Sequence, residues 1–346
     1  AIRSSQASTV WKLFWPANCD RPAEREVAMS VLLLSEDDVR RLLTMDEALE
    51  AVEIGLKKLA LDEAENVPRS RCRTDHAMLH VLPASAKGLG VLGYKAYVTG
   101  KGGTNFQVAL FDGRTGEQLA LMQADYLGQV RTGAASGVAT RVLARADATT
   151  AGLYGTGKQA RTQLLAVCKV RSIRRAHVYS RDADRRRRFA EEMTVACGTE
   201  VIPVDRPEAA AEGLDIVITA TSSREPVLKG AWVAEGAHLN IVGSNFLGKA
   251  EIDVETVRRA GLIVVDSKEQ AKIESGDLLP AVEQGVLRWS SLVDLGQVLV
   301  GAAPGRKNAR EITLFKSHGI GIEDIAVAAR VYARAKEQGR GRSLDW

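Results

Sequence analysis

The spacing of hydrophobic residues changes along the chain and predicts a different kind of structure in each part. Ala48, Val52 and Leu56 recur at the interval of one helical face, and Thr44 with Glu47 matches the capping-box pattern that begins a helix. We therefore expect the first block of the chain to open with helices.

Between residues 67 and 125 the pattern becomes short and β-rich. Gly, Pro and Asp-Gly separate brief apolar segments, as they do in antiparallel sheets. Strands are expected at residues 78–82, 90–98 and 107–111, followed by a helix of small residues at 126–143. This block is thus predicted to be α+β.

From residue 148 onward, buried strands alternate with helices. The expected strands are residues 149–154, 176–180, 200–204, 215–220, 238–242 and 262–265, and the expected helices are 158–168 and 184–196. Such alternation is typical of βαβ units on a parallel sheet. A last helix, expected at residues 323–336, has no further strand to follow it and is predicted to pack back on the first block.

These patterns predict an α/β fold with two domains. Residues 146–305 would form a doubly wound parallel-sheet domain of the Rossmann type, and residues 29–145 with 306–346 would form a discontinuous α+β domain. Residues 1–28 show neither helical nor alternating spacing, and they are predicted to be a disordered extension.

Composition narrows the class of protein. Of the 346 residues, 45% are hydrophobic and 26% are charged, which is ordinary for a globular chain. No apolar run approaches the roughly 20 residues of a membrane span, so a membrane protein is excluded. A formal charge of only +4 makes nucleic acid a poor candidate partner.

The cysteines and histidines point away from metal binding. Four widely spaced cysteines and five histidines form none of the usual metal-ligand spacings. We therefore expect a reduced, cytoplasmic protein without a metal site.

A glycine-rich turn carries the first chemical signal. Gly155-Thr-Gly157-Lys158-Gln159-Ala follows a predicted buried strand and opens a predicted helix. In this GxGxxA pattern the first glycine permits a tight turn, and the second lets the backbone approach a pyrophosphate at the positive helix N-terminus. The strand before it and the helix after it distinguish the motif from a chance run of glycines, so we predict a dinucleotide site here.

The end of the next strand, Ser180-Arg181, indicates which dinucleotide binds. NAD sites usually offer an acid here to the ribose hydroxyls, whereas a hydroxyl and a guanidinium suit a 2′-phosphate. We predict NADP(H) as the preferred cofactor. NAD(H) is the alternative, with Asp182 or Asp184 supplying the acid.

Six segments complete a recognisable pattern: Gly93-Tyr-Lys95, Arg131–Ser136, Gly155–Ala160, Thr219–Ser222, Gly243–Glu251 and Leu314–Gly319. Through them the chain resembles the ornithine cyclodeaminase/μ-crystallin family over residues 30–336. The resemblance implies a Rossmann domain and a discontinuous domain that binds substrate and forms a homodimer. It also implies further cofactor contacts, at Arg131, Thr132, Thr219, Ala220, Thr221, Gly243, Ser244, Asn245, Lys249 and Ser317.

The resemblance further implies a cluster of cations around the carboxylate of a small substrate. In this chain the members are Lys95, Arg131 and either Arg69 or Arg71, two arginines that share one face of a predicted strand. Charge-assisted hydrogen bonds from such a cluster would align the substrate for hydride transfer. Lys95 is the preferred candidate for the proton donor.

Two histidines, His80 and His318, are the other candidates for the proton donor. Asn245, the second predicted catalytic residue, departs from the family pattern, since cyclodeaminases carry an aspartate beside the nicotinamide. Asparagine cannot exchange a proton, but it can position a substrate by hydrogen bonds. Imine reduction can proceed with a residue here that only positions the substrate, whereas cyclodeamination calls for one that exchanges protons. Asn245 therefore favours a reductase.

We therefore expect an NAD(P)H-dependent reductase that transfers hydride to the C=N bond of a small imino acid. The substrate would be a cyclic ketimine, such as pyrroline- or piperideine-2-carboxylate, or an open-chain imino acid. In the second case the protein would be an amino-acid dehydrogenase, such as alanine dehydrogenase. The alternatives are an ornithine or lysine cyclodeaminase and a crystallin-like NADP-binding protein.

Overall fold

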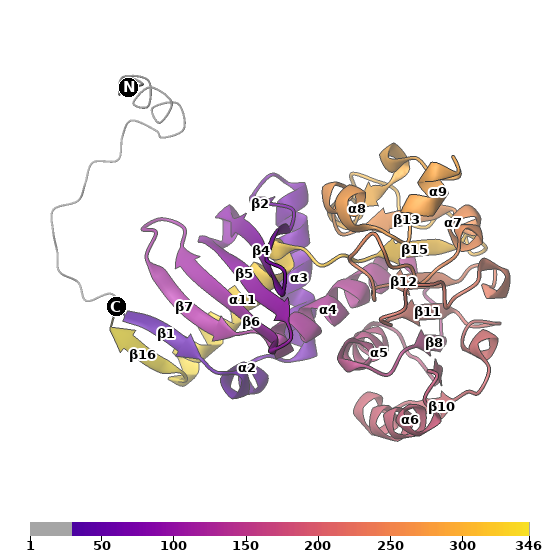
Figure 1. Cartoon of the computed structure of the whole chain (residues 1–346), viewed down its shortest axis with the longest axis horizontal. Helices are drawn as coiled ribbons and strands as arrows, with labels where there is room; N and C mark the ends of the chain where they lie inside the picture. The colour runs from indigo at the N-terminus through magenta and orange to yellow at the C-terminus, as the bar shows by residue number, and fades with distance from the viewer. Residues whose placement is uncertain (1–29, 346) are drawn as a thin grey trace.

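A computed structural model describes residues 30–345, which form two sheets with their own helices (Figure 1). The predicted disordered extension, residues 1–28, lies outside the described residues. The predicted fold class is confirmed, because one sheet is wholly parallel and carries the βαβ units, and a separate mixed sheet packs with the remaining helices.

The mixed sheet has the strand order β16-β1-β7-β6-β5-β4-β2, with β3 paired to β4. Its neighbours run antiparallel, except that β1 and β7 are parallel. The sequence pattern anticipated β4, β5 and β6 but not β1, β7 or the short, polar β16. The strands are β1 (Ser30–Leu34), β2 (Ala64–Asn66), β3 (Ser70–Arg73), β4 (Ala77–Ala86), β5 (Val91–Gly100), β6 (Gly103–Asp112), β7 (Gln118–Gln123) and β16 (Arg342–Asp345).

Helices cover one face of the mixed sheet and bury the largest apolar cluster of the described chain. They are α2 (Glu36–Leu42), α3 (Met45–Ala60), α4 (Asp125–Leu143) and α11 (Gly321–Gln338). The expected capping box is present at α3, where Thr44 Oγ1 accepts the Glu47 N–H at 3.3 Å. The other face of the sheet leaves Leu79, Leu92 and Val98 exposed.

The parallel sheet has the order β10-β9-β8-β11-β12-β15-β13-β14. Successive residues of β11 enter different apolar clusters: Ile216 and Ile218 pack on the side of α5 and α6, and Val217 packs on the opposite side. The sheet is therefore covered on both faces. Its strands are β8 (Thr150–Tyr154), β9 (Arg175–Tyr179), β10 (Glu200–Pro203), β11 (Ile216–Thr219), β12 (His238–Ile241), β13 (Leu262–Val265), β14 (Val293–Asp294) and β15 (Thr313–Lys316).

Several short helices surround the parallel sheet. The α-helices are α5 (Lys158–Val170), α6 (Ala183–Cys197), α7 (Val254–Arg259), α8 (Lys268–Glu274), α9 (Leu279–Glu283) and α10 (Leu295–Leu299). The 3₁₀ turns of the described chain are η2 (Lys87–Leu89), η3 (Pro207–Ala210), η4 (Gly230–Trp232) and η5 (Trp289–Ser291).

The position of β15 differs from the sequence-based expectation that residues 306–346 belong to the other domain. This strand pairs with both β12 and β13 and lies inside the parallel sheet. All four of its residues are buried, which is the pattern of a strand covered on both faces. The chain then crosses to α11, which packs on α3 and on β4 and β5, so residues 317–320 connect the two sheets.

Helix α4 also joins the two parts of the molecule. It packs against α3, α5 and α11 and reaches β12 and β15 (Figure 1). Gly133 allows the close approach to α5, because a Cβ there would lie 2.4 Å from the carbonyl oxygen of Thr162. Arg131, near the middle of α4, is consequently held in the interior of the protein.

Candidate functional site

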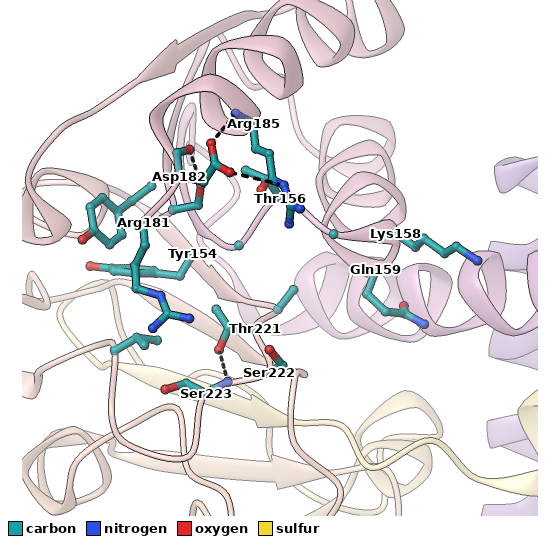
Figure 2. A pocket seen from close by; sticks show the side chains of 16 residues that line it. Tyr154, Thr156, Lys158, Gln159, Arg181, Asp182, Arg185, Thr221, Ser222 and Ser223 are labelled. Atoms are coloured by element: carbon teal, nitrogen blue, oxygen red, sulfur yellow. Dashed lines mark hydrogen bonds and ion pairs between the residues drawn. The ribbon is translucent and has the colours of Figure 1, made fainter. Parts of the chain in front are cut away.

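A cleft of about 590 Å³ opens at the carboxyl ends of β8, β9 and β11 (Figure 2). The strand order reverses here, because β9 and β10 lie on one side of β8, and β11 and β12 lie on the other. Ligands of open α/β sheets bind at such switch points. Eight residues predicted to bind the cofactor line this cleft: Gly155, Gly157, Lys158, Gln159, Ser180, Arg181, Ala220 and Thr221.

The glycine-rich turn fits the pyrophosphate of a dinucleotide. Gly155 has φ +108°, and a Cβ there would lie 2.4 Å from the carbonyl oxygen of Ala220. No side chain caps the N-terminus of α5 at Gly157, whereas Asp182 caps α6 and Ser267 caps α8. Since a Cβ on Gly157 would meet no atom within 4 Å, the backbone N–H groups of the first turn of α5 adjoin open space, where an anion can bind.

The far end of the cleft carries the residues predicted to distinguish NADP from NAD. Asp182 accepts the Arg185 N–H at 3.0 Å, and its carboxylate lies 3.3 Å from Arg185 Nε. The carboxylate of Asp182 thus caps the N-terminus of α6. Arg181 projects along the cleft toward Ser223 (Figure 2), and Ser180 also lines this cleft.

A second cavity of about 260 Å³ lies between the two domains and shares Gln159, Ala220 and Thr221 with the first cleft. A ligand in this cavity would therefore adjoin one end of a molecule in the nucleotide cleft. Predicted site residues make up much of its wall: Arg69, Lys95, Arg131, Thr132, Gln159, Ala220, Thr221, Gly243, Asn245 and Ser317.

Lys95 and Arg131 are buried at this cavity and share one carboxylate. Asp324 Oδ1 lies 3.1 Å from Lys95 Nζ and 2.8 Å from Arg131 Nε, and Glu323 lies 2.7 Å from Arg131 Nη1. Burial and the nearby Arg131 lower the pKa of Lys95 to about 8, although Asp324 opposes this. Burial raises the pKa of Glu323 to about 8, against the attraction of Arg131.

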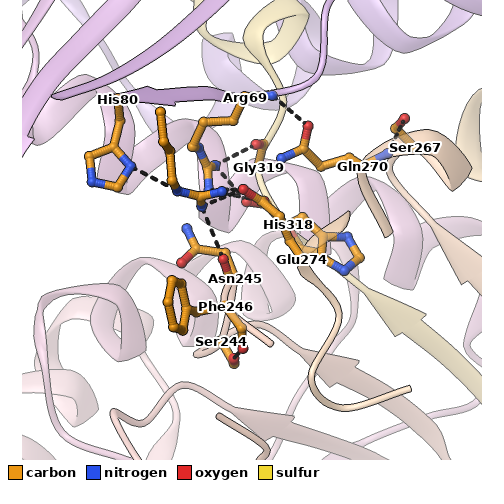
Figure 3. Close-up of polar contacts among 12 residues, drawn as sticks. Arg69, His80, Ser244, Asn245, Phe246, Ser267, Gln270, Glu274, His318 and Gly319 are labelled. Atoms are coloured by element: carbon orange, nitrogen blue, oxygen red, sulfur yellow. Dashed lines mark hydrogen bonds and ion pairs between the residues drawn. The ribbon is translucent and has the colours of Figure 1, made fainter. Parts of the chain in front are cut away.

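Arg69 and Arg71 meet a carboxylate of the other domain, Glu274 of α8 (Figure 3). Arg69 donates to Glu274 at 3.0 and 3.2 Å, and its second terminal nitrogen donates to the carbonyl oxygens of His318 and Gly319 at 2.9 Å each. Arg69 lines the second cavity. Arg71 does not line it, although both arginines were candidates for the same role.

Arg71 instead supports the segment that carries Asn245. Its Nη2 donates to the carbonyl oxygen of Asn245 at 3.2 Å, and its Nε donates to His80 Nδ1 at 3.2 Å. Lys316 fixes the preceding residue by donating to the Ser244 carbonyl oxygen at 2.6 Å. The backbone of this segment is thus anchored from both sheets, and Asn245 lines the cavity.

A buried carboxylate, Glu251, joins the ends of β11 and β12. It accepts hydrogen bonds from the N–H groups of Thr221 and Gly243 at 2.6 Å each, and from the hydroxyls of Thr219 and Thr221 at 2.8 and 2.7 Å. Thr221 and Gly243 both line the second cavity. Glu251 therefore fixes the wall of the cavity without lining it.

The two histidines differ in position. His318 lines the second cavity, and its Nδ1 lies 3.0 Å from Asp266 Oδ1. His80 does not line it, and burial with the neighbouring Arg71 and Arg69 lowers the pKa of His80 to about 4. The imidazolium form of His80, which would be the effective proton donor, is therefore disfavoured at neutral pH.

Three residues predicted to contact the cofactor do not line either cavity. Thr219 and Ser244 are buried and hydrogen-bonded within the protein, and Lys249 is half-buried, with its carbonyl oxygen accepting from Ser244 Oγ at 3.0 Å. Lys158 lines the first cleft, but its amine extends outward to Asp125 at 2.7 Å (Figure 2).

Sequence reasoning did not identify the buried acids of the site: Glu251, Asp266, Glu274, Glu323 and Asp324. Glu251 ends the family segment Gly243–Glu251, but no function was predicted for its side chain. Glu323 and Asp324 occupy the first turn of a helix, where acids are common for reasons unrelated to a site. Only the fold brings these acids to the cations.

No helix among residues 30–345 is long and apolar enough to cross a membrane. No group of three or more His, Cys, Asp or Glu side chains in this range could hold a metal ion.

Comparison with known proteins identifies the scaffold. Residues 29–339 match the model of the ornithine cyclodeaminase/mu-crystallin family. The chain belongs to this family. A Delta(1)-pyrroline-2-carboxylate reductase from Bacillus cereus is 34% identical over 326 residues, which cover 91% of this chain and all of that protein.

Two solved structures of this family superpose closely on the chain. The Delta(1)-pyrroline-2-carboxylate reductase of Thermococcus litoralis, in complex with NADH and L-proline, has a TM-score of 0.87 and 39% identity, covering 91% of this chain and 100% of that one. An archaeal alanine dehydrogenase dimer with bound NAD has a TM-score of 0.87 and 34% identity, covering 92% and 100%. Both are oxidoreductases of C=N or CH–NH₂ groups by name.

Proposed function

We propose that this protein is an NAD(P)H-dependent reductase that acts on the C=N bond of a small imino acid. The observation that carries the proposal is the cluster of buried cations, Arg69, Lys95 and Arg131, in a cavity that adjoins the nucleotide cleft. Burying several cations together costs free energy unless anions pair with them. The carboxylate of a substrate would be an additional anionic partner for this cluster.

The proposed roles follow from position. Arg69 and Arg131 would bind the substrate carboxylate, and Lys95 would protonate the imine nitrogen. Asn245 would position that nitrogen by hydrogen bonding. The reduced nicotinamide supplies the hydride, and its dinucleotide would be held by Gly155, Gly157 and Gln159 of the first cleft and by Ala220 and Thr221 where the cavities meet.

A cyclic ketimine is the preferred substrate in this proposal. The second cavity, at about 260 Å³, suits a five- or six-membered ring bearing one carboxylate. Tyr97 and Phe106 contribute aromatic rings to its wall, with centroids 5.9 and 5.5 Å from Lys95 Nζ. The names of the relatives, pyrroline-2-carboxylate reductase and alanine dehydrogenase, support this class of reaction.

NADPH is the proposed preferred donor, although the solved relatives carry NADH or NAD. Ser180 and Arg181 line the cleft beyond β9, and Asp182 is already occupied as the cap of α6. A 2′-phosphate would therefore meet a hydroxyl and a guanidinium, and the nearest carboxylate is balanced by Arg185.

We also propose a homodimer formed by the exposed face of the mixed sheet. On that face Val81 lies opposite Ala96, and Tyr94 lies opposite Pro83 and Ala109. Leu79, Leu92 and Val98 are 37, 40 and 42% exposed on the same face. Such a broad apolar surface is typical of a protein interface, and a solved relative is described as a dimer.

A substrate comparison tests the proposed reaction. The purified protein should oxidise NADPH in the presence of pyrroline-2-carboxylate or piperideine-2-carboxylate, and it should form no proline or ammonia from ornithine with catalytic NAD. Release of ammonia from ornithine would instead establish a cyclodeaminase. Saturable binding of NADPH without turnover on cyclic and open-chain imino acids would indicate a crystallin-like binding protein.

A further inference from the structure

One carboxylate, Asp324, holds two of the proposed substrate-binding cations. Its Oδ1 lies 3.1 Å from Lys95 Nζ and 2.8 Å from Arg131 Nε. The three side chains come from three different elements, β5, α4 and α11, and all are buried. The relative position of the amine and the guanidinium is therefore determined by an acid that does not itself line the cavity.

The fold surrounds the buried carboxylate of Asp324 with positive charge. Asp324 occupies the first turn of the 18-residue helix α11, and no side chain caps that N-terminus. The positive end of the helix dipole and two cations therefore surround the carboxylate. Gly319, with φ +73°, turns the chain into this helix, and a Cβ there would lie 2.5 Å from Arg131 Nη1, so the turn also confines the guanidinium.

Asp324 and its neighbour Glu323 differ in the cations with which they form ion pairs. Glu323 contacts Arg131 at 2.7 Å, whereas Asp324 contacts both cations. The other charged or titratable residues that line the cavity with Lys95 are Arg69, Tyr97, Asp125, Arg131 and His318. Among the residues that surround the amine, Asp324 is the acid that forms an ion pair with it.

We propose that Asp324 is a positioning residue that fixes Lys95 against Arg131 and keeps the Lys95 amine protonated for donation to the imine nitrogen. The proposal rests on the proposed reductase function. In the reaction, hydride adds to the imine carbon, the C=N π electrons pass to nitrogen, and a Lys95 proton forms the new N–H bond. The amine left on Lys95 is then reprotonated from solvent.

The balance of charges at Lys95 supports this role. Burial and Arg131 both disfavour the ammonium form, and Asp324 favours it, with a resulting pKa of about 8. Without Asp324 the first two effects would be unopposed, and the pKa of Lys95 would fall further. A proton donor must be protonated to act, so the rate should decline as the pH rises through this pKa, and should decline at lower pH when Asp324 is neutralised.

The test compares the wild type with Asp324→Asn, which keeps an oxygen for Arg131 but removes the charge. In the profile of kcat against pH, the decline at high pH should shift downward by about one to three units, the range for loss of a close opposite charge. The affinity for NADPH should stay within about threefold of the wild type, which separates this effect from general disruption of the site. Glu323→Gln is the matched control, and it should shift the profile by less than Asp324→Asn.

A second measurement does not depend on turnover. The Lys95 ammonium can be followed by NMR in isotopically labelled protein and assigned with Lys95→Arg, and its pKa should be lower in Asp324→Asn than in the wild type. An unchanged pKa, or an equal change in Glu323→Gln, would overturn the proposal. If the wild type reduces no imino acid, the proposed function fails, whereas the NMR titration still decides whether Asp324 holds the proton on Lys95.

Discussion

Lys95 illustrates how one buried side chain is controlled by opposing neighbours. Burial and Arg131 reduce its affinity for a proton, Asp324 increases it, and the pKa of about 8 places the amine close to neutral pH. Candidate acids and bases are most effective when their pKa lies near the working pH. Tyr97 and Phe106 complete the apolar surroundings of the amine.

Replacing Lys95 with Met tests this residue directly. We expect kcat to fall by about 100-fold or more, since a positioned general acid contributes about 10²–10⁴, while the dissociation constant for NADPH changes little. Steady-state kinetics with NADPH and an imino acid give kcat, and fluorescence titration of NADPH gives the dissociation constant. Lys57→Met, on the exposed face of α3, is the control, and wild-type kinetics in Lys95→Met would remove this residue from the mechanism.

Ser180 tests the adenosine end of the cleft. Ser180→Asp should lower the ratio of kcat/KM for NADPH over NADH by about tenfold or more, because a carboxylate repels the 2′-phosphate and accepts from ribose hydroxyls. Arg181→Ala should lower the same ratio by removing a cation. If neither variant alters the ratio, the 2′-phosphate is bound elsewhere.

At the scale of secondary-structure elements, Glu251 pairs with hydrogen-bond donors at the ends of two parallel strands, as a capping residue pairs with donors at the end of a helix. Four donors at the ends of β11 and β12 share one buried carboxylate. Burial and the nearby Asp277 raise the pKa of Glu251. The loops after these strands carry Thr221 and Gly243, so the shape of the substrate cavity depends on this contact.

Glu251→Gln should destabilise the protein and weaken cofactor binding together. An amide presents one acceptor oxygen and two N–H donors, so it leaves part of this donor set unpaired, at a cost of about 2–3 kcal/mol. Urea unfolding and NADPH titration measure the two effects. Glu255→Gln, in the exposed ion pair with Arg258 on α7, should change stability by less than about 0.5 kcal/mol. Equal effects of the two substitutions would contradict this role of Glu251.

Local patterns were enough to predict β8, the glycine-rich turn and α5, because strand, turn and helix are continuous in the sequence. The position of β15 could not be predicted in this way, since its neighbours β12 and β13 precede it and the choice between two domains is made by tertiary packing. The same holds for the acids at Lys95 and Arg69. Asp324 is 229 residues from Lys95 and 193 from Arg131, and Glu274 is 205 residues from Arg69.

At the scale of the whole molecule, the two faces of the mixed sheet have different tasks. One face carries Lys95 toward the substrate cavity, and the other presents the apolar residues of the proposed dimer. Because side chains alternate along a strand, β5 contributes to both. Association of two chains would therefore stiffen the strand that holds the reactive amine.

Substituting Val81 with Arg tests the proposed dimer. A charge in the centre of the apolar face should abolish association, so light scattering should show the mass of one chain, 37.3 kDa, where the wild type shows twice that value. Val195→Arg, at an exposed position of α6, makes the same change away from this face and should remain dimeric. A wild type that is monomeric at micromolar concentration would refute the proposed interface.

The insertion of β15 between β12 and β13 has a consequence for dissecting the molecule. A fragment limited to residues 146–305 would lack an interior strand and would leave two facing rows of backbone donors and acceptors without partners. Such bare strand edges recruit other chains. A fragment that contains the nucleotide-binding domain must therefore include residues 311–317 as well. A circularly permuted chain that joins this segment to residues 146–305 would supply the missing strand.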